Sequence, residues 1–407
     1  MVKFVVSLIT IFVLVIGVVG IFTGNYTVFF ACLLISLFLQ GLNFWNERIF
    51  AGLTVSRSFT RRKVFCGQKV KLEVTVENRK LLPLAGLTVE SNLSPHLKFI
   101  NQEYISRGMG SGDKFKDTFF LKWYERIKRS YEIVPTHRGR QSIYFLRLEY
   151  TDPFGIFNNS LEEEGLCRLL VYPRLVPVAA AAPAFSMLFG SKPREGWIFQ
   201  DRLNRVGVRE YTPVDDIRGI NWKVSARRGE LYSDIYRPSL EKEVSIVHCL
   251  NESPGISGKV NSRDFELSLI VAASLADEYL RRGYSVEFFS SHRSGYGSRE
   301  YTTVPAAGEK GREAVLTTMA LLENRGRIRS EEMLVELSNE IETGGRMVVI
   351  TGKNYPGLKH AFKAIEKRFE VLVISIDEAE ERLQDVNQLF VQNKEDYNEI
   401  REIRLSS

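Results

Sequence analysis

The sequence predicts a multi-domain fold: an N-terminal transmembrane helical hairpin, a β-sandwich of immunoglobulin-like type, and a C-terminal doubly wound α/β domain. Three observations predict it. The first 46 residues carry one charge, apolar residues then alternate with polar ones, and after residue 243 apolar strands alternate with amphipathic helices. The expected ranges are 1–47 for the hairpin, 52–175 for the β-sandwich, 176–205 for a linker, 206–243 for a motif segment, 244–378 for the α/β domain and 379–407 for a C-terminal tail.

The hairpin is predicted from two apolar stretches, residues 4–22 and 26–44. Each is close to the ~20 residues that a helix needs to cross a bilayer. Only a three-residue turn separates them, so both chain ends are expected on one side. Lys3 precedes the first stretch and Arg48 follows the second. The positive-inside rule therefore predicts a two-span protein of the cell membrane with its other domains in the cytoplasm. A cleaved signal peptide would leave the second stretch unexplained.

Period-two alternation predicts the β-sandwich. Residues 64–77 alternate apolar and polar side chains, as a strand with one buried face does. Further short strands are expected as far as residue 172, with turn signals such as Arg138-Gly139 between them. Many short strands with regular turns are typical of an antiparallel sandwich.

The α/β domain is predicted from an alternation that begins with a continuous apolar strand over residues 244–250. A helix is expected over 264–281, and later strands over 285–290, 347–351 and 371–376. Such alternation is typical of a doubly wound sheet, in which ligands bind at the carboxyl ends of the strands. The loops at these ends begin at Asn251, Ser291, Gly352 and Asp377.

Composition argues against several functional classes. The net charge of +6 comes without a dense basic cluster that contains aromatics, so a membrane surface is favoured over nucleic acid. The four cysteines are far apart, which predicts reduced thiols. The sequence contains no phosphate-binding P-loop motif and no H-E-x-x-H motif. No enzyme is predicted, although a Cys–His nucleophile pair stays open because such partners need only be close in space.

The densest cluster of unusual residues lies in residues 207–228, where charges are mixed with aromatic rings. This mixture suggests partly buried arginine–carboxylate pairs, because a planar guanidinium binds carboxylates bidentately and stacks on rings. Two interpretations stay open: the segment only joins the two domains, or it forms a partner-binding surface. The candidate residues are Arg209, Tyr211, Asp215, Asp216, Arg218, Trp222, Ser225 and Arg227.

The stretches 209–211, 215–218, 220–223 and 225–227 together resemble the signature of the domain-of-unknown-function-58 family. Residues 152–157 and 171–174 add further matches. The resemblance implies a bacterial or archaeal membrane protein whose last domain is similar to a von Willebrand factor A domain. It also implies a non-catalytic scaffold or adaptor, with a MoxR-type AAA+ ATPase and a transglutaminase-like membrane protein as partners.

The sequence departs from the metal site that the resemblance implies. A von Willebrand A domain binds Mg²⁺ through Asp-x-Ser-x-Ser, because this hard cation prefers oxygen ligands. Here Asn251 replaces the aspartate and Gly255 the second serine, and Gly352 stands where a later aspartate is expected. We therefore predict neither a metal nor another cofactor. The alternative is a metal-dependent ligand-binding module, in which Mg²⁺ is held by a rebuilt site. The positions concerned are Asn251, Glu252, Ser253, Gly255, Thr351 and Gly352.

Overall fold

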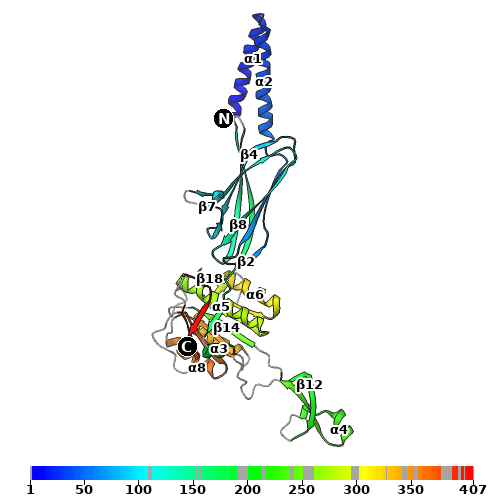
Figure 1. Cartoon of the computed structure of the whole chain (residues 1–407), viewed down its shortest axis with the longest axis vertical. Helices are drawn as coiled ribbons and strands as arrows, with labels where there is room; N and C mark the ends of the chain where they lie inside the picture. Colours follow the sequence, from blue (N-terminus) through cyan, green and yellow to red (C-terminus); the bar gives the residue numbers. More distant parts are fainter. Residues whose placement is uncertain are drawn as a thin grey trace. The chain divides into compact units, whose positions relative to one another are not determined.

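The computed structural model divides into two compact units, Met1–Pro173 and Arg174–Ser407. It describes residues 2–108, 112–152, 155, 157–180, 182–189, 200–212, 217–238, 243–250, 261–294, 302–326, 328–341, 346–352, 356–376, 387–392, 396–397 and 399–406. Figure 1 shows the elements of each unit along the chain.

Two apolar helices, α1 (Val2–Phe22) and α2 (Tyr26–Glu47), open the first unit. They lie side by side after a three-residue turn (Figure 1). Gly17 permits this close approach, because a Cβ at this position would stand 3.1 Å from the Cβ of Cys32. Within the described residues, α2 is long and apolar enough to cross a membrane, and Ser7–Phe22 is a shorter apolar helix. An apolar N-terminal helix is therefore confirmed.

Two β-sheets form the rest of the first unit. Their buried faces supply one hydrophobic core, with Leu72 and Val74 from one sheet and Val89 and Leu148 from the other. This core explains the period-two pattern of the sequence. The four-stranded sheet has the order β1 (Leu53–Phe59), β3 (Val70–Asn78), β8 (Arg126–Pro135), β5 (Leu97–Phe99). The six-stranded sheet has the order β2 (Lys63–Phe65), β10 (Asn158–Tyr172), β9 (Gly139–Thr151), β4 (Leu84–Leu93), β7 (Gly112–Leu121), β6 (Ile105–Gly108).

The C-terminal end of α2 is seated in this β-domain. Ile49, two residues beyond the helix, is 1% exposed and belongs to the hydrophobic core. The Lys80 ammonium donates to the carbonyl oxygen of Arg48 at 3.0 Å and also to that of Ile49. It thereby pairs with carbonyl groups just beyond the end of the helix. The helix thus continues into the core without a free linker.

An eight-stranded sheet forms the centre of the second unit. Its order is β11 (Val178–Ala180), β22 (Ile403–Ser406), β21 (Asn387–Val391), β20 (Glu370–Ser375), β19 (Arg346–Thr351), β14 (Glu243–Cys249), β15 (Ser285–Ser290), β17 (Thr302–Ala306). Strands β15, β14, β19, β20 and β21 run parallel, and β17 pairs antiparallel with β15. If β14, β15, β17, β19, β20 and β21 are numbered 1 to 6, their spatial order is 3-2-1-4-5-6.

Helices cover both faces of this sheet. The helices are α3 (Ala182–Phe189), α5 (Ser262–Arg281), α6 (Gly308–Leu321), α7 (Ser330–Glu340) and α8 (Pro356–Glu366). One core cluster joins α7 and α8 to the face of the sheet that carries Val247 and Val349. The opposite face carries His248, which contacts α5 through Ser268. The second unit also contains a small pair of strands, β16 (His292–Ser294) and β18 (Leu322–Gly326).

Two ranges differ from the expectation. The segment 176–205, predicted to be a linker, contains β11, α3 and the start of β12 (Gln200–Glu210). The predicted tail, 379–407, contains β21 and β22, which extend the sheet. Strands β11 and β22 are only three and four residues long and pair across the chain, Val178 with Ile403. Such short strands are specified by distant partners, so local periodicity does not reveal them.

Candidate functional site

The motif segment folds into a two-stranded ribbon. Strand β12 pairs antiparallel with β13 (Tyr232–Pro238). Between them lie a short 3₁₀ turn, η2 (Ile217–Gly219), and the helix α4 (Trp222–Arg228). We refer to residues 200–238 as the ribbon. The segment is therefore an element with its own hydrogen bonds.

Asn221 holds α4 against β13. Its side-chain oxygen accepts from the backbone N–H of Val224 at 3.1 Å, and so caps the helix. Its side-chain amide donates to a carboxylate oxygen of Asp234 at 2.7 Å. Its backbone N–H donates to the carbonyl oxygen of Tyr232 at 2.8 Å. One buried asparagine thus fixes both the start of the helix and its position on the strand.

Ser225 makes a second link inside the ribbon. Its hydroxyl donates to the Asn221 carbonyl oxygen at 2.8 Å and accepts from the Tyr232 N–H at 2.9 Å. The helix then ends at Gly229, whose φ of 79° is in the left-handed region that favours glycine. Ser225 is 7% exposed, so this predicted site residue has a structural role.

The ribbon exposes several apolar and basic side chains. Trp222 and Ile217 are each 67% exposed, and Leu231 is 46% exposed. Lys223 and Arg227, one helical turn apart, are exposed as well. An exposed tryptophan beside two cations has the composition of a protein-binding surface, because tryptophan and arginine are enriched among residues that dominate binding energy. We call Trp222, Lys223 and Arg227 the α4 face.

An arginine does stack on an aromatic ring in the ribbon, but this arginine is not among the predicted site residues. The Arg228 guanidinium lies over the Tyr232 ring, 5.1 Å from its centroid, and donates to the Tyr232 hydroxyl at 3.4 Å. This hydrogen bond raises the pKa of Arg228. Of the predicted residues, Arg209 is exposed on β12 and Tyr211 is half-buried.

The predicted carboxylates of the motif, Asp215 and Asp216, lie outside the described residues. Arg218 has its backbone in η2, and its side chain is not described. The expected arginine–carboxylate pairs therefore stay a prediction. Asn221 was missed because an N-cap asparagine looks like any polar residue until the helix start and its neighbouring strand are known.

The second predicted site falls at the carboxyl ends of β14 and β19. Four of its six positions, Asn251, Glu252, Ser253 and Gly255, lie outside the described residues. The two that are described, Thr351 and Gly352, are both buried. The Thr351 hydroxyl has no hydrogen-bond partner among the described residues, and its carbonyl oxygen accepts from the Ile376 N–H at 2.9 Å. These two positions supply one hydroxyl and no carboxylate.

A buried hydrogen-bond network lies beside these strand ends. His248 Nδ1 is 3.1 Å from the Ser290 hydroxyl, and Nε2 is 2.8 Å from the Ser268 hydroxyl. The Ser268 hydroxyl donates to the Phe265 carbonyl oxygen, so it accepts from Nε2–H. Nδ1 then accepts from Ser290. The imidazole thus ties β14 to β15 and α5, and its position indicates a role in the core.

Cys249 follows on the opposite face of β14. Complete burial raises the pKa of its thiol, and the nearby Ser330 hydroxyl offsets this in part. A thiol of this kind is a poor nucleophile, because the thiolate is the reactive form. Among the described residues, no group of three histidine, cysteine or acidic side chains is placed to hold a metal ion.

These features define a class before any comparison: a multi-domain chain with an apolar N-terminal helix, sheet-rich domains and an exposed aromatic and basic face on a ribbon. Residues 207–406, just under half of the chain, match the family model described as "Protein of unknown function DUF58". The match begins within β12, and it includes residues 207–238 of the ribbon and every strand of the second unit's sheet except β11. The resemblance of the motif is therefore confirmed for this part of the chain.

A relative in Bacillus subtilis (strain 168) is similar to the chain as well. It is described as "Uncharacterized protein YeaD" and is 24% identical over 233 residues. The match covers 56% of this chain and 53% of the relative, so the chain spans about half of the relative's length.

Matches to solved structures are distant. One is the CARDB domain of a Pyrococcus furiosus protein in complex with di-metal ions, 12% identical, covering 30% of this chain and 96% of that one, with a TM-score of 0.20. Another is a non-cellulosomal cohesin from Archaeoglobus fulgidus, 11% identical, covering 29% and 91%, also with a TM-score of 0.20.

Proposed function

We propose that this protein is a membrane-anchored scaffold or adaptor that binds protein partners and does not itself catalyse a reaction. The observation that carries this proposal is the α4 face. Trp222 is two-thirds exposed while its neighbour Asn221 is locked by hydrogen bonds on two sides. A rigid base that presents an exposed aromatic anchor favours recognition of another protein, because little side-chain and backbone freedom is lost on binding.

The anchor that we propose is the pair α1 and α2, both spanning the membrane. They are 21 and 22 residues long, and apolar side chains such as Phe12 and Leu34 point outward, 63% and 67% exposed. Such lengths suit a bilayer, and outward apolar side chains suit lipid. The positive charges flanking the pair favour a cytoplasmic position for both sheet-rich units.

For the two units we propose an immunoglobulin-like sandwich and a von Willebrand A-like domain. The two packed sheets of the first unit support the former. The 3-2-1-4-5-6 order of the second unit is that of a doubly wound sheet, which supports the latter. We propose that this domain acts without a metal or another cofactor, because Gly352 offers no side-chain ligand where a carboxylate is expected.

The partner that we propose is a MoxR-type AAA+ ATPase, with a transglutaminase-like membrane protein in the same assembly. Support comes from the match of residues 207–406 to DUF58 and from the exposed α4 face. The test is a crosslinked pull-down of the full-length protein from native membranes, compared with Trp222→Ala. We expect recovery of the ATPase to fall at least about tenfold in this variant, because a central aromatic anchor contributes about 2 kcal/mol or more.

The matched control is Trp123→Ala. Trp123 is 64% exposed on the first unit, so this variant removes the same amount of exposed ring from a different surface. The ATPase should be recovered with this control as well as with the unmodified protein. Equal recovery with Trp222→Ala would return the ribbon to a purely structural role. Failure to recover any ATPase would remove the proposed partner.

A further inference from the structure

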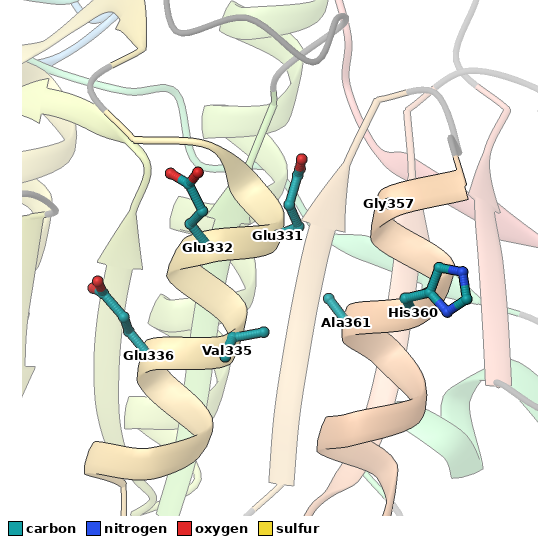
Figure 2. A pocket seen from close by; sticks show the side chains of 7 residues that line it. All are labelled: Glu331, Glu332, Val335, Glu336, Gly357, His360 and Ala361. Carbon is teal, nitrogen blue, oxygen red and sulfur yellow. The ribbon is translucent and has the colours of Figure 1, made fainter.

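A groove between α7 and α8 has an apolar floor and an acidic side. It has a volume of about 500 Å³, and its lining includes Val335, Ala361 and His360. Figure 2 shows Val335 and Ala361 pointing toward one another from the two helices. Val335 is 44% exposed. An exposed aliphatic side chain at the floor of a groove is a feature of docking surfaces.

The acidic residues that line this groove all belong to α7, and one of them, Glu332, lies 3.9 Å from Arg329 in an exposed and therefore weak ion pair. Glu331 lies at the start of the helix, and Glu332 and Glu336 project on the side of α7 away from α8 (Figure 2). Glu332 and Glu336 are four residues apart and therefore lie one helical turn from each other. The groove thus suits a basic segment that also carries an apolar anchor.

The α4 face of this same chain has that chemistry. Trp222 supplies an exposed ring, and Lys223 and Arg227 are exposed one turn apart. This spacing equals that of the two glutamates, so two helices lying side by side can form two ion pairs together. We propose that the α4 face of one copy docks into the α7–α8 groove of a second copy, with Trp222 over Val335.

The path of the chain between the ribbon and the sheet favours a second copy, instead of the same chain, as the occupant of the groove. The ribbon leads through residues 239–242 into the start of β14, at the amino-terminal edge of the parallel sheet. The lining residues Glu331 and Gly357 belong to the first turns of α7 and α8, at the opposite edge. A contact between two different surfaces is head-to-tail, so it joins copies into a row or a ring.

This association needs no other protein, and it deepens the proposed function by covering the α4 face that the partner would use. The test is sedimentation velocity of the purified full-length protein in detergent, over a hundredfold range of concentration. At low salt we expect concentration-dependent association, which weakens as salt is raised. Lys223→Glu with Arg227→Glu should weaken it at least about tenfold, and so should Glu332→Lys with Glu336→Lys.

Two further variants make the test specific. The fourfold variant that carries both reversals restores opposite charges across the contact, so it should associate again. Lys363→Glu with Lys367→Glu changes two exposed charges, one on α8 and one just after it, that do not line the groove, and it should leave association unchanged. A protein that stays monomeric at every concentration, or a fourfold variant that fails to associate, would overturn the proposal. Neither result would alter the outcome of the ATPase pull-down, which uses Trp222→Ala with its own control.

Discussion

Lys80 is a partly buried cation at the point where α2 meets the β-domain. Its ammonium donates to the carbonyl oxygens of Arg48 and Ile49, and burial lowers its pKa from 10.5 to about 8. The unfolded chain keeps this proton up to its ordinary pKa, while the folded protein loses it near pH 8. Between these two values the unfolded state binds more protons, so stability rises with pH across this window.

We predict that the midpoint of thermal unfolding rises from pH 8 to pH 10 more steeply in the unmodified protein than in Lys80→Met. The variant has no titrating group at this position, so it lacks this part of the slope. Differential scanning fluorimetry of both proteins in detergent measures the difference. Parallel slopes for the two proteins would contradict the assignment of the shifted pKa to Lys80.

Single residues also show where sequence reasoning reaches its limit. Trp222 and Arg227 were singled out from the mixture of charges and aromatic rings, and the structure places both on α4 with exposed side chains. Asn221 and His248 were not, although both are buried with side-chain hydrogen bonds in the structure. Their partners, Asp234 and Ser268, are 13 and 20 residues away. A hydrogen bond across such a separation depends on packing, which no local pattern contains.

At the scale of elements, the ribbon depends on one cap. We predict that Asn221→Ala loosens α4 and β13 by about 1–2 kcal/mol, because a helix cap and a buried hydrogen bond are both lost. Hydrogen exchange of residues 222–234 should accelerate about tenfold, which corresponds to about 1.4 kcal/mol.

The control for this prediction is Asn261→Ala. Asn261 caps α5 by accepting from the Arg263 N–H at 3.1 Å. The Asn261→Ala variant therefore removes a helix cap elsewhere in the second unit. Exchange in the ribbon should not change in this variant. Unchanged exchange in Asn221→Ala would mean that the pairing of β12 with β13 holds the ribbon without the cap.

Elements with a strong apolar pattern were predictable, and an element without one was not. The helix expected over 264–281 is α5, Ser262–Arg281, and the strand expected over 347–351 is β19, Arg346–Thr351. The first shows the helical period of apolar residues, and the second is a continuous apolar run. The ribbon's α4 has seven residues with an exposed tryptophan, so it shows no buried stripe. It owes its position to Asn221 and Ser225 instead of to hydrophobic periodicity.

At the scale of the whole molecule, the first unit begins before its first strand. We predict that a fragment of residues 48–407 is soluble without detergent and folded, because it keeps Ile49 and the carbonyl oxygens that Lys80 contacts. A fragment of residues 52–407 loses the buried Ile49 side chain, which costs about 2–3 kcal/mol. It should therefore unfold at a lower temperature.

Thermal unfolding of the two fragments, followed by circular dichroism, tests this prediction. Equal midpoints would show that the junction adds nothing to the β-domain. A 48–407 fragment that still sediments with membranes would place a membrane contact outside α1 and α2.

The seating of α2 has a mechanical consequence. Ile49 is buried in the β-domain core, and Lys80 binds the backbone just beyond the helix. These contacts couple the end of α2 to the two sheets. A rotation of α2 about its long axis would therefore act on the buried Ile49 side chain and on the two Lys80 hydrogen bonds. If α1 and α2 span the membrane as we propose, a movement of these helices within the bilayer would be passed to the β-domain through these contacts.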